Sequence, residues 1–268
     1  MKIAGKLFVL LLGLVLSFVA VGSQLPAKSE SMTLSSAINK SGRQRMLSQR
    51  IVKAYCQIGL KVQPDKSKTI LENSVNLFDS QLVELKQFAA RPDIQETLAK
   101  ESLLWAEFRA VATSAVTLDG AKRLMYLNEE LLQTAHKATL LFESLAGTKT
   151  GRLVNISGRQ RMLSQRLTKF YMLKKWGFNQ PEITSGIEQA KKEFVTAQQE
   201  LAAAPQNTST IRQELELAKV QWIFFENALS KQGTAEDLML LSNVATASEH
   251  ILEVMDKVTG LYEKVEGN

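Results

Sequence analysis

Ten residues, SGRQRMLSQR, occur twice without a change in this chain of 268 residues, at 41–50 and again at 157–166. Each copy carries three arginines. A guanidinium group is always charged and donates paired hydrogen bonds in one plane, which suits carboxylates, phosphates and other flat oxyanions. The repeated segment is therefore the first candidate for chemistry, and the chemistry that its residue types favour is anion binding.

The spacing of small and apolar residues places the first of these segments on a helix. One set of positions recurs at steps of four and three, the pattern of a seam that faces another helix: Leu34, Ile38, Ser41, Arg45, Ser48 and Val52. A second stripe lies elsewhere on the same helix and includes Leu47, Ile51, Ala54 and Ile58. One stripe is enough to hold a helix in its own bundle, so the other must meet a further helix.

Arg45 occupies the middle of that seam, and Arg161 occupies the matching place in the second copy. An arginine on a packed seam loses its hydration unless an anion pairs with it. No Asp or Glu occurs within residues 31–63 or 148–179, so neither helix supplies that anion itself. We therefore expect an external anion to lie between the two guanidinium groups.

The residues around these arginines are small. Gly42 and Gly158 lie one turn before them, let the backbones approach closely and expose peptide N–H groups. Ser41 and Ser157 are the neighbouring seam positions. This setting leaves space of the size of a small ligand, whereas a helix that binds a protein partner more often carries large anchors there.

The repetition extends over the whole chain. An offset of 116 residues relates the two decapeptides, and further positions repeat at nearly the same offset: Asn39 with Asn155, Tyr55 with Tyr171, Phe78 with Phe194, and Trp105 with Trp222. Prolines and glycines divide each copy into four helices, with Asp119 as the expected cap of the fourth and breaks in the second copy at Pro181, Pro205 and Gly233. We predict an all-α chain of two tandem up-down four-helix bundles, copy 1 over 31–146 and copy 2 over 148–265.

Composition agrees with a helical protein and excludes other classes. Aromatic residues make up 7% and glycine plus proline 19 residues, which disfavours a turn-rich β protein. The net charge is +6, modest for this length, so nucleic acid is not expected as a partner. The single cysteine, Cys56, has no internal partner and is interpreted as a small apolar core residue, with a reactive thiol as the alternative.

The amino terminus has the pattern of an export signal. Lys2 and Lys6 precede the apolar run LFVLLLGLVLSFVAV, and small residues follow it. We interpret residues 1–23 as a signal peptide and expect the mature chain in the periplasm of a Gram-negative cell. An uncleaved amino-terminal membrane anchor is the alternative.

The segments around the two decapeptides resemble a known family. They read INKSGRQRMLSQR and VNISGRQRMLSQR, and they resemble the start of the PilJ-type domain of type IV pilus chemotaxis transducers. They are also similar to the nitrate-sensing domain of NarX-type kinases. The resemblance implies nitrate or nitrite bound across two such helices, with Arg45 and Arg161 as ligand residues, Gly42 and Gly158 as the family glycine, and Lys40 as the box lysine. Copy 2 has Ile156 in place of that lysine, so the resemblance implies unequal copies.

No set of nucleophile, base and orienting residue is evident, so an enzyme is not expected, and no cofactor is implied. His136 and His250 do not repeat and lack metal-ligand spacing, so no metal is expected either. Two functions remain: a periplasmic small-anion sensor, and a protein-interaction module without a small ligand. The chain ends at Asn268 without an output domain, so a sensor would act through a separate partner such as a membrane-bound sensor or transducer.

The duplication offers an explanation for the retained decapeptide. A site with pseudo-two-fold symmetry needs the same donors from both halves, and one chain with two copies is able to complete such a site internally. The alternative is that the bundles stack end to end and each seam pairs with a second molecule, as in a homodimer.

Overall fold

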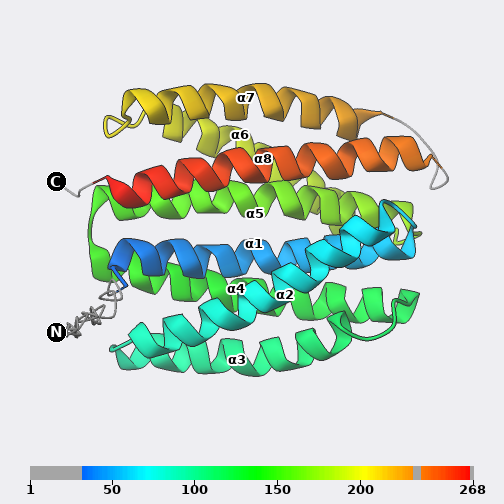
Figure 1. Ribbon diagram of the computed structural model, residues 1–268, viewed down its shortest axis with the longest axis horizontal. Helices are drawn as coiled ribbons and strands as arrows, with labels where there is room; N and C mark the ends of the chain where they lie inside the picture. Colours follow the sequence, from blue (N-terminus) through cyan, green and yellow to red (C-terminus); the bar gives the residue numbers. More distant parts are fainter. Residues whose placement is uncertain (1–31, 232–236, 266–268) are drawn as a thin grey trace, which may run out of the picture. The chain divides into compact units, whose positions relative to one another are not determined.

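The computed structural model describes residues 32–231 and 237–265. This part of the chain contains eight α-helices and no strand (Figure 1). The helices are α1 Leu34–Gly59, α2 Pro64–Phe88, α3 Pro92–Ala112, α4 Leu118–Ala146, α5 Lys149–Lys175, α6 Pro181–Ala202, α7 Ser209–Ser230 and α8 Leu238–Lys264. The predicted all-α helical bundle is confirmed. The predicted signal peptide at 1–23 and the predicted break at Gly233 lie outside the described residues.

The helices begin where the local sequence predicts. Three of them, α2, α3 and α6, start with proline, whose fixed φ and missing N–H suit the first helical position. Helix α4 ends at Ala146, and Gly147 after it takes a left-handed conformation with φ 61°. The copies are thus joined by only two residues, Gly147 and Thr148, before α5 begins.

The expected cap of α4 was wrong by two residues. Thr117, not Asp119, is the N-cap, and its hydroxyl accepts a hydrogen bond from the Gly120 N–H at 3.0 Å. A threonine oxygen caps a helix in the same way as a carboxylate. Val116 and Thr117 are both β-branched, which favours the extended backbone that Thr117 adopts as the cap, with φ -138° and ψ 161°.

Helices α1 and α5 lie side by side at the centre (Figure 1). Around α1 pack α2 and α4, with α3 against α4; around α5 pack α6 and α8, with α7 against α8. Each copy thus contributes four helices, and the copies meet through α1 and α5 in one compact unit from Met32 onward. The end-to-end alternative is therefore wrong, because the two arginine helices face one another within the chain. Whether each copy folds by itself stays a prediction.

The core repeats as the sequence offsets predict. Phe78 stacks on Trp105 with ring centroids 3.8 Å apart, and Phe194 stacks on Trp222 with centroids 4.1 Å apart. All four side chains are buried. The matched stacks show that the tandem duplication extends to packing, even though the sequences of these helices have diverged.

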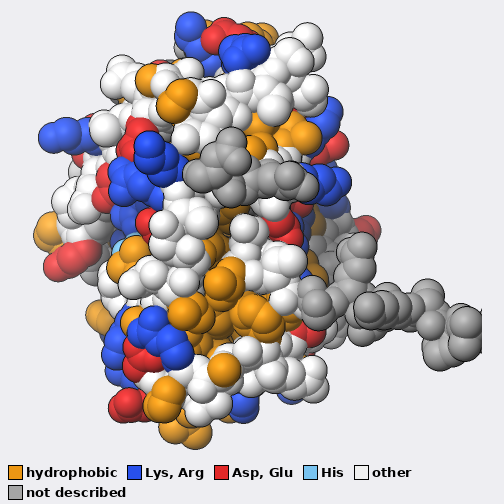
Figure 2. All heavy atoms as spheres, turned by 90° about the vertical axis from the view of Figure 1, so that its left-hand side faces the viewer, with side chains coloured by type: hydrophobic (Ala, Val, Ile, Leu, Met, Phe, Trp, Pro, Cys, Tyr) orange, Lys and Arg blue, Asp and Glu red, His pale blue; other side chains and the backbone are white. Residues whose placement is uncertain are grey.

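The surface carries charges of both signs. Figure 2 shows the end of the molecule that faces left in Figure 1, where Lys and Arg lie close to Asp and Glu and hydrophobic side chains gather in the lower half. None of the helices within the described residues is long and apolar enough to cross a membrane. Cys56 is buried and unpaired, in agreement with its interpretation as a core residue.

Candidate functional site

The arginines on the two seams meet inside the molecule. Arg45 of α1 and Arg161 of α5 are 1% and 0% exposed. A Cβ built on Gly42 would lie 3.0 Å from Arg45 Nη2 and 3.9 Å from Arg161 Nη2, and one built on Gly158 would lie 3.1 Å from Arg161 Nη2 and 3.7 Å from Arg45 Nη2. Both guanidinium groups therefore reach one small region of the α1–α5 interface, and the two glycines leave the space that they occupy.

Each arginine also contacts the opposite copy. Arg45 Nη2 donates to the carbonyl oxygen of Asn155 at 3.2 Å, while Arg161 Nη2 donates to the carbonyl oxygen and Oδ1 of Asn39 at 3.3 and 2.7 Å. The Nε atoms of both arginines are buried and have no hydrogen-bond partner among the described residues. Both side chains therefore retain a donor that an additional acceptor could satisfy.

Other predicted site residues contribute less directly. The hydroxyls of Ser41 and Ser157 donate to carbonyl oxygens of their own helices, at 2.8 and 2.7 Å, so these serines supply small size rather than donors. Lys40 forms an ion pair with Glu84 of α2. The structure therefore does not bring Lys40 into the arginine cluster, and the imbalance between the copies has another origin.

That origin is a difference in the last helix of each copy. Arg161 Nη1 pairs with Asp256 of α8, which also accepts a hydrogen bond from Arg43 Nη2 at 2.7 Å. In copy 1 the corresponding contact of Arg45 is with His136 Nδ1 of α4, at 3.1 Å. KATLLFES and KVTGLYEK relate these two helices at an offset of 120 residues, and the same offset pairs His136 with Asp256.

The electrostatics differ accordingly. Burial, together with the charges of Arg159 and Arg161, lowers the pKa of Arg45 to about 9. Burial also lowers the pKa of His136 to about 4, together with the charges of Arg45 and Arg159. The histidine is therefore neutral at pH 7, and its Nδ1 accepts from Arg45. Arg45 thus contacts a neutral ring where Arg161 contacts a carboxylate.

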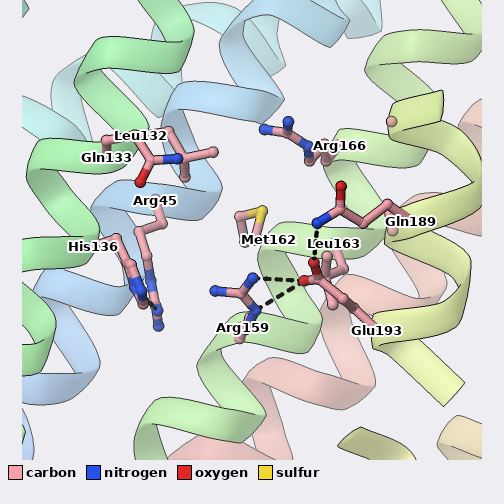
Figure 3. Close-up of a pocket in the computed structure, with 12 residues that line it drawn as sticks. Arg45, Leu132, Gln133, His136, Arg159, Met162, Leu163, Arg166, Gln189 and Glu193 are labelled. Atoms are coloured by element: carbon pink, nitrogen blue, oxygen red, sulfur yellow. Dashed lines mark hydrogen bonds and ion pairs between the residues drawn. The ribbon is translucent and has the colours of Figure 1, made fainter. Parts of the chain in front are cut away.

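A pocket of about 210 Å³ opens beside Arg45, between α1, α4, α5 and α6 (Figure 3). Arg159 extends from α5 toward Arg45 and His136, with Glu193 of α6 on its other side. Arg159 Nε and Nη2 both donate to Glu193 Oε2, at 3.1 and 2.6 Å. The other lining residues mix polar and apolar groups: Leu132, Gln133, Met162, Leu163, Arg166, Gly186, Gln189 and Ala190.

A second layer of buried charges joins the copies. Lys53 of α1 is fully buried, forms an ion pair with Glu249 of α8 and donates to Gln165 Oε1 at 2.6 Å. Lys169 of α5 is equally buried and contacts Glu129 of α4 at 3.2 Å. Arg50 and Arg166 pair with the same two glutamates. Each of these pairs crosses from one copy to the other.

Sequence reasoning did not find His136, Asp256 or the buried lysines. His136 and His250 do not occupy matching positions of the duplication. The informative signal was the 120-residue offset, which aligns His136 with Asp256 and Glu129 with Glu249. Arg43 and Arg159 lie off the seam, and each forms an ion pair with another helix: Arg43 with Asp256 of α8 and Arg159 with Glu193 of α6.

Comparison with known families gives one match. The family model PilJ, described as "Type IV pili methyl-accepting chemotaxis transducer N-term", matches residues 28–129. The match confirms for copy 1 the resemblance that the decapeptide indicated, and it indicates a sensor or signalling module. Neither the curated proteins nor the solved structures that were compared with the chain gave a match.

Proposed function

We propose that the chain is a non-catalytic sensor module that binds a small anion between α1 and α5 and passes the bound state to a separate signalling partner. The observation that carries the proposal is the convergence of Arg45 and Arg161, one from each copy, beside Gly42 and Gly158. Two buried cations repel each other, so an anion that contacts both is expected to stabilise the interface.

The resemblance to pilus chemotaxis transducers supports the signalling part of the proposal. It makes nitrate and nitrite the first anions to test, because both are small and flat, as the paired donors of two guanidinium groups require. It also makes a membrane-bound sensor or transducer the proposed partner, and the periplasm the proposed location. Binding would act on that partner by changing how α1 and α5 pack against each other, since the two copies meet there.

Calorimetric titration with nitrate, nitrite and other small oxyanions tests this function. We expect one anion per chain, and a loss of affinity of at least tenfold in both Arg45→Ala and Arg161→Ala, because each removes half of a shared set of donors. Arg123→Ala is a matched control, since Arg123 is exposed and pairs with Glu107 at the surface. If each site variant kept half of the binding sites at unchanged affinity, the shared site would be wrong.

A second candidate, a protein-interaction module, is favoured by the outer face of α7. Four large apolar side chains are 42% to 61% exposed there: Leu217, Val220, Ile223 and Phe224. At the offset of 117 residues set by the tryptophans, copy 1 has Ala106 and Glu107 in place of Ile223 and Phe224. Copy 2 therefore has large apolar side chains at two positions where copy 1 has a smaller and a charged residue, whereas Val220 corresponds to the exposed Leu103.

This candidate predicts that the variant Ile223→Ala with Phe224→Glu loses an association that the unchanged chain has. Sedimentation of the purified chain, alone and with membranes that contain its partner, measures that association. Leu140→Ala is the control, because Leu140 is an exposed leucine of α4 outside this face. Equal sedimentation of the α7 variant and the unchanged chain would remove the reason to assign an interaction to α7.

A further inference from the structure

Asp256 shows that two arginines of the α1–α5 interface can hold a carboxylate between them. Its carboxylate contacts Arg161, the seam arginine of copy 2, and Arg43, which lies on α1 of copy 1. Burial would raise the pKa of Asp256, but the charges of Arg161 and Arg43 outweigh it and lower the pKa, so the carboxylate is ionised. The molecule thus contains a carboxylate bound between a seam arginine and an arginine of the opposite copy.

The pseudo-symmetric pair is Arg45 with Arg159. Arg45 is the seam arginine of copy 1, and Arg159 matches Arg43 at the 116-residue offset. Here α4 presents His136 in place of an aspartate, so no carboxylate of the described residues lies between the two, and Glu193 pairs with Arg159 on its other side (Figure 3). Two of the three nitrogens of Arg159 donate to Glu193, and the third points toward Arg45 and His136 (Figure 3).

Donors in this pocket suit a carboxylate. Arg45 is almost completely buried, lines the pocket, and has an Nε without a partner among the described residues. Because His136 Nδ1 accepts from Arg45, the ring proton lies on Nε2, which leaves a second donor for an anion. Arg159 adds a third donor from the opposite wall. A carboxylate has two oxygens and about four acceptor positions, enough for all of these donors.

The pocket is larger than a nitrate ion. Its volume of about 210 Å³ corresponds to roughly seven water molecules at their share of liquid volume. Nitrate has only four heavy atoms. Leu132, Met162 and Leu163 line the remainder together with Gln133 and Gln189. Arg166, which pairs with Glu129, also lines the pocket, so there is space for a short carbon chain with or without a second carboxylate.

We propose that this pocket binds the carboxylate of a small organic acid between Arg45 and Arg159, in the way that Asp256 is held between Arg161 and Arg43. The inference rests on the proposed function, a small anion bound between α1 and α5, and refines it: it names the ligand class and takes Arg159 as the second arginine, because Asp256 already pairs with Arg161. Asp256 acts as a built-in ligand of copy 2, so each chain takes one external carboxylate.

Calorimetric titration of the full chain with sodium acetate, propionate and succinate, and with sodium nitrate for comparison, tests the proposal. We expect at least one of these carboxylates to bind with one site per chain, and Arg159→Ala to lower its affinity at least tenfold. His136→Asp should abolish binding, since it places a carboxylate beside Arg45 as Asp256 does beside Arg161. Asp256→His should raise the stoichiometry from one to two, and thermal unfolding of each variant confirms that it is folded.

Carboxylate binding that is unchanged in both Arg159→Ala and His136→Asp would overturn the inference. Nitrate binding that is lost in Arg45→Ala and Arg161→Ala, with no response to any of the three carboxylates, would overturn it while the proposed small-anion function stands. No binding of any of these four anions, nor of nitrite or the other small oxyanions, would contradict both.

Discussion

Replacing Glu101 by methionine is expected to increase the free energy of unfolding by about 2 kcal/mol or more at pH 7. Glu101 lies on α3, is fully buried, and neither of its carboxyl oxygens has a hydrogen-bond partner among the described residues. A buried polar group without a partner destabilises the folded state. Methionine has a similar length and no charge, so the substitution removes that penalty without opening a cavity.

The second copy provides the matched control. At the offset of 117 residues that pairs Trp105 with Trp222, Ala218 of α7 corresponds to Glu101, and Ala218 is also fully buried. Ala218→Glu should therefore destabilise the chain, since it introduces the same buried carboxyl into copy 2. Urea unfolding followed by circular dichroism measures both effects. A stability of Glu101→Met below that of the unchanged chain would mean that Glu101 has a favourable partner.

The same residue gives stability a defined pH dependence. Burial raises the pKa of Glu101 to about 8 from its usual value of 4.5. Between these two values the folded state keeps a proton that the unfolded state releases, so stability is full below pH 4.5 and falls as the pH rises through 8. The whole change is on the order of 5 kcal/mol. Unfolding measured at pH 5 and at pH 8.5 should show this loss, and Glu101→Met should remove most of it.

The features that could be predicted from the sequence are those with a local signal. Proline at the first residue of α2, α3 and α6, and glycine after α4, mark helix ends without reference to the rest of the chain. The two stripes on the decapeptide helix predicted that it meets more than its own bundle, and α1 does lie between its bundle and α5. Convergence of Arg45 and Arg161 followed from that placement and from the duplication.

The remaining features depend on helices far away in the sequence. The absence of Asp and Glu near Arg161 suggested an external anion, but Asp256 reaches it from α8, 95 residues later. Lys40 was assigned to the site by resemblance, whereas Glu84 of α2 holds it elsewhere. The decapeptide specifies which donor groups lie on α1 and α5, but the side chains of the neighbouring helices determine what those donors contact. Those helices are the parts of the duplication that have diverged most.

Substitution of Glu249 by alanine is expected to lower the free energy of unfolding by about 3 kcal/mol at pH 7, because it removes the carboxylate that faces the fully buried Lys53. Burial would raise the pKa of Glu249, but the charges of Lys53 and Arg50 outweigh it and lower the pKa to about 2. The stabilisation is therefore present above pH 4.5 and lost as the pH falls toward 2. Thermal and urea unfolding between pH 2 and pH 7 measure it.

Glu129→Ala is the matched control for this substitution, since Glu129 faces Lys169 in the pseudo-symmetric position. Its effect should be smaller, because the Glu129 side chain is 42% exposed whereas that of Glu249 is 18% exposed, and water screens the more exposed pair. Both ion pairs cross between the copies, so the double variant should loosen the α1–α5 interface and weaken anion binding as well as stability. Equal destabilisation by the two single variants would mean that exposure does not determine the strength of these pairs.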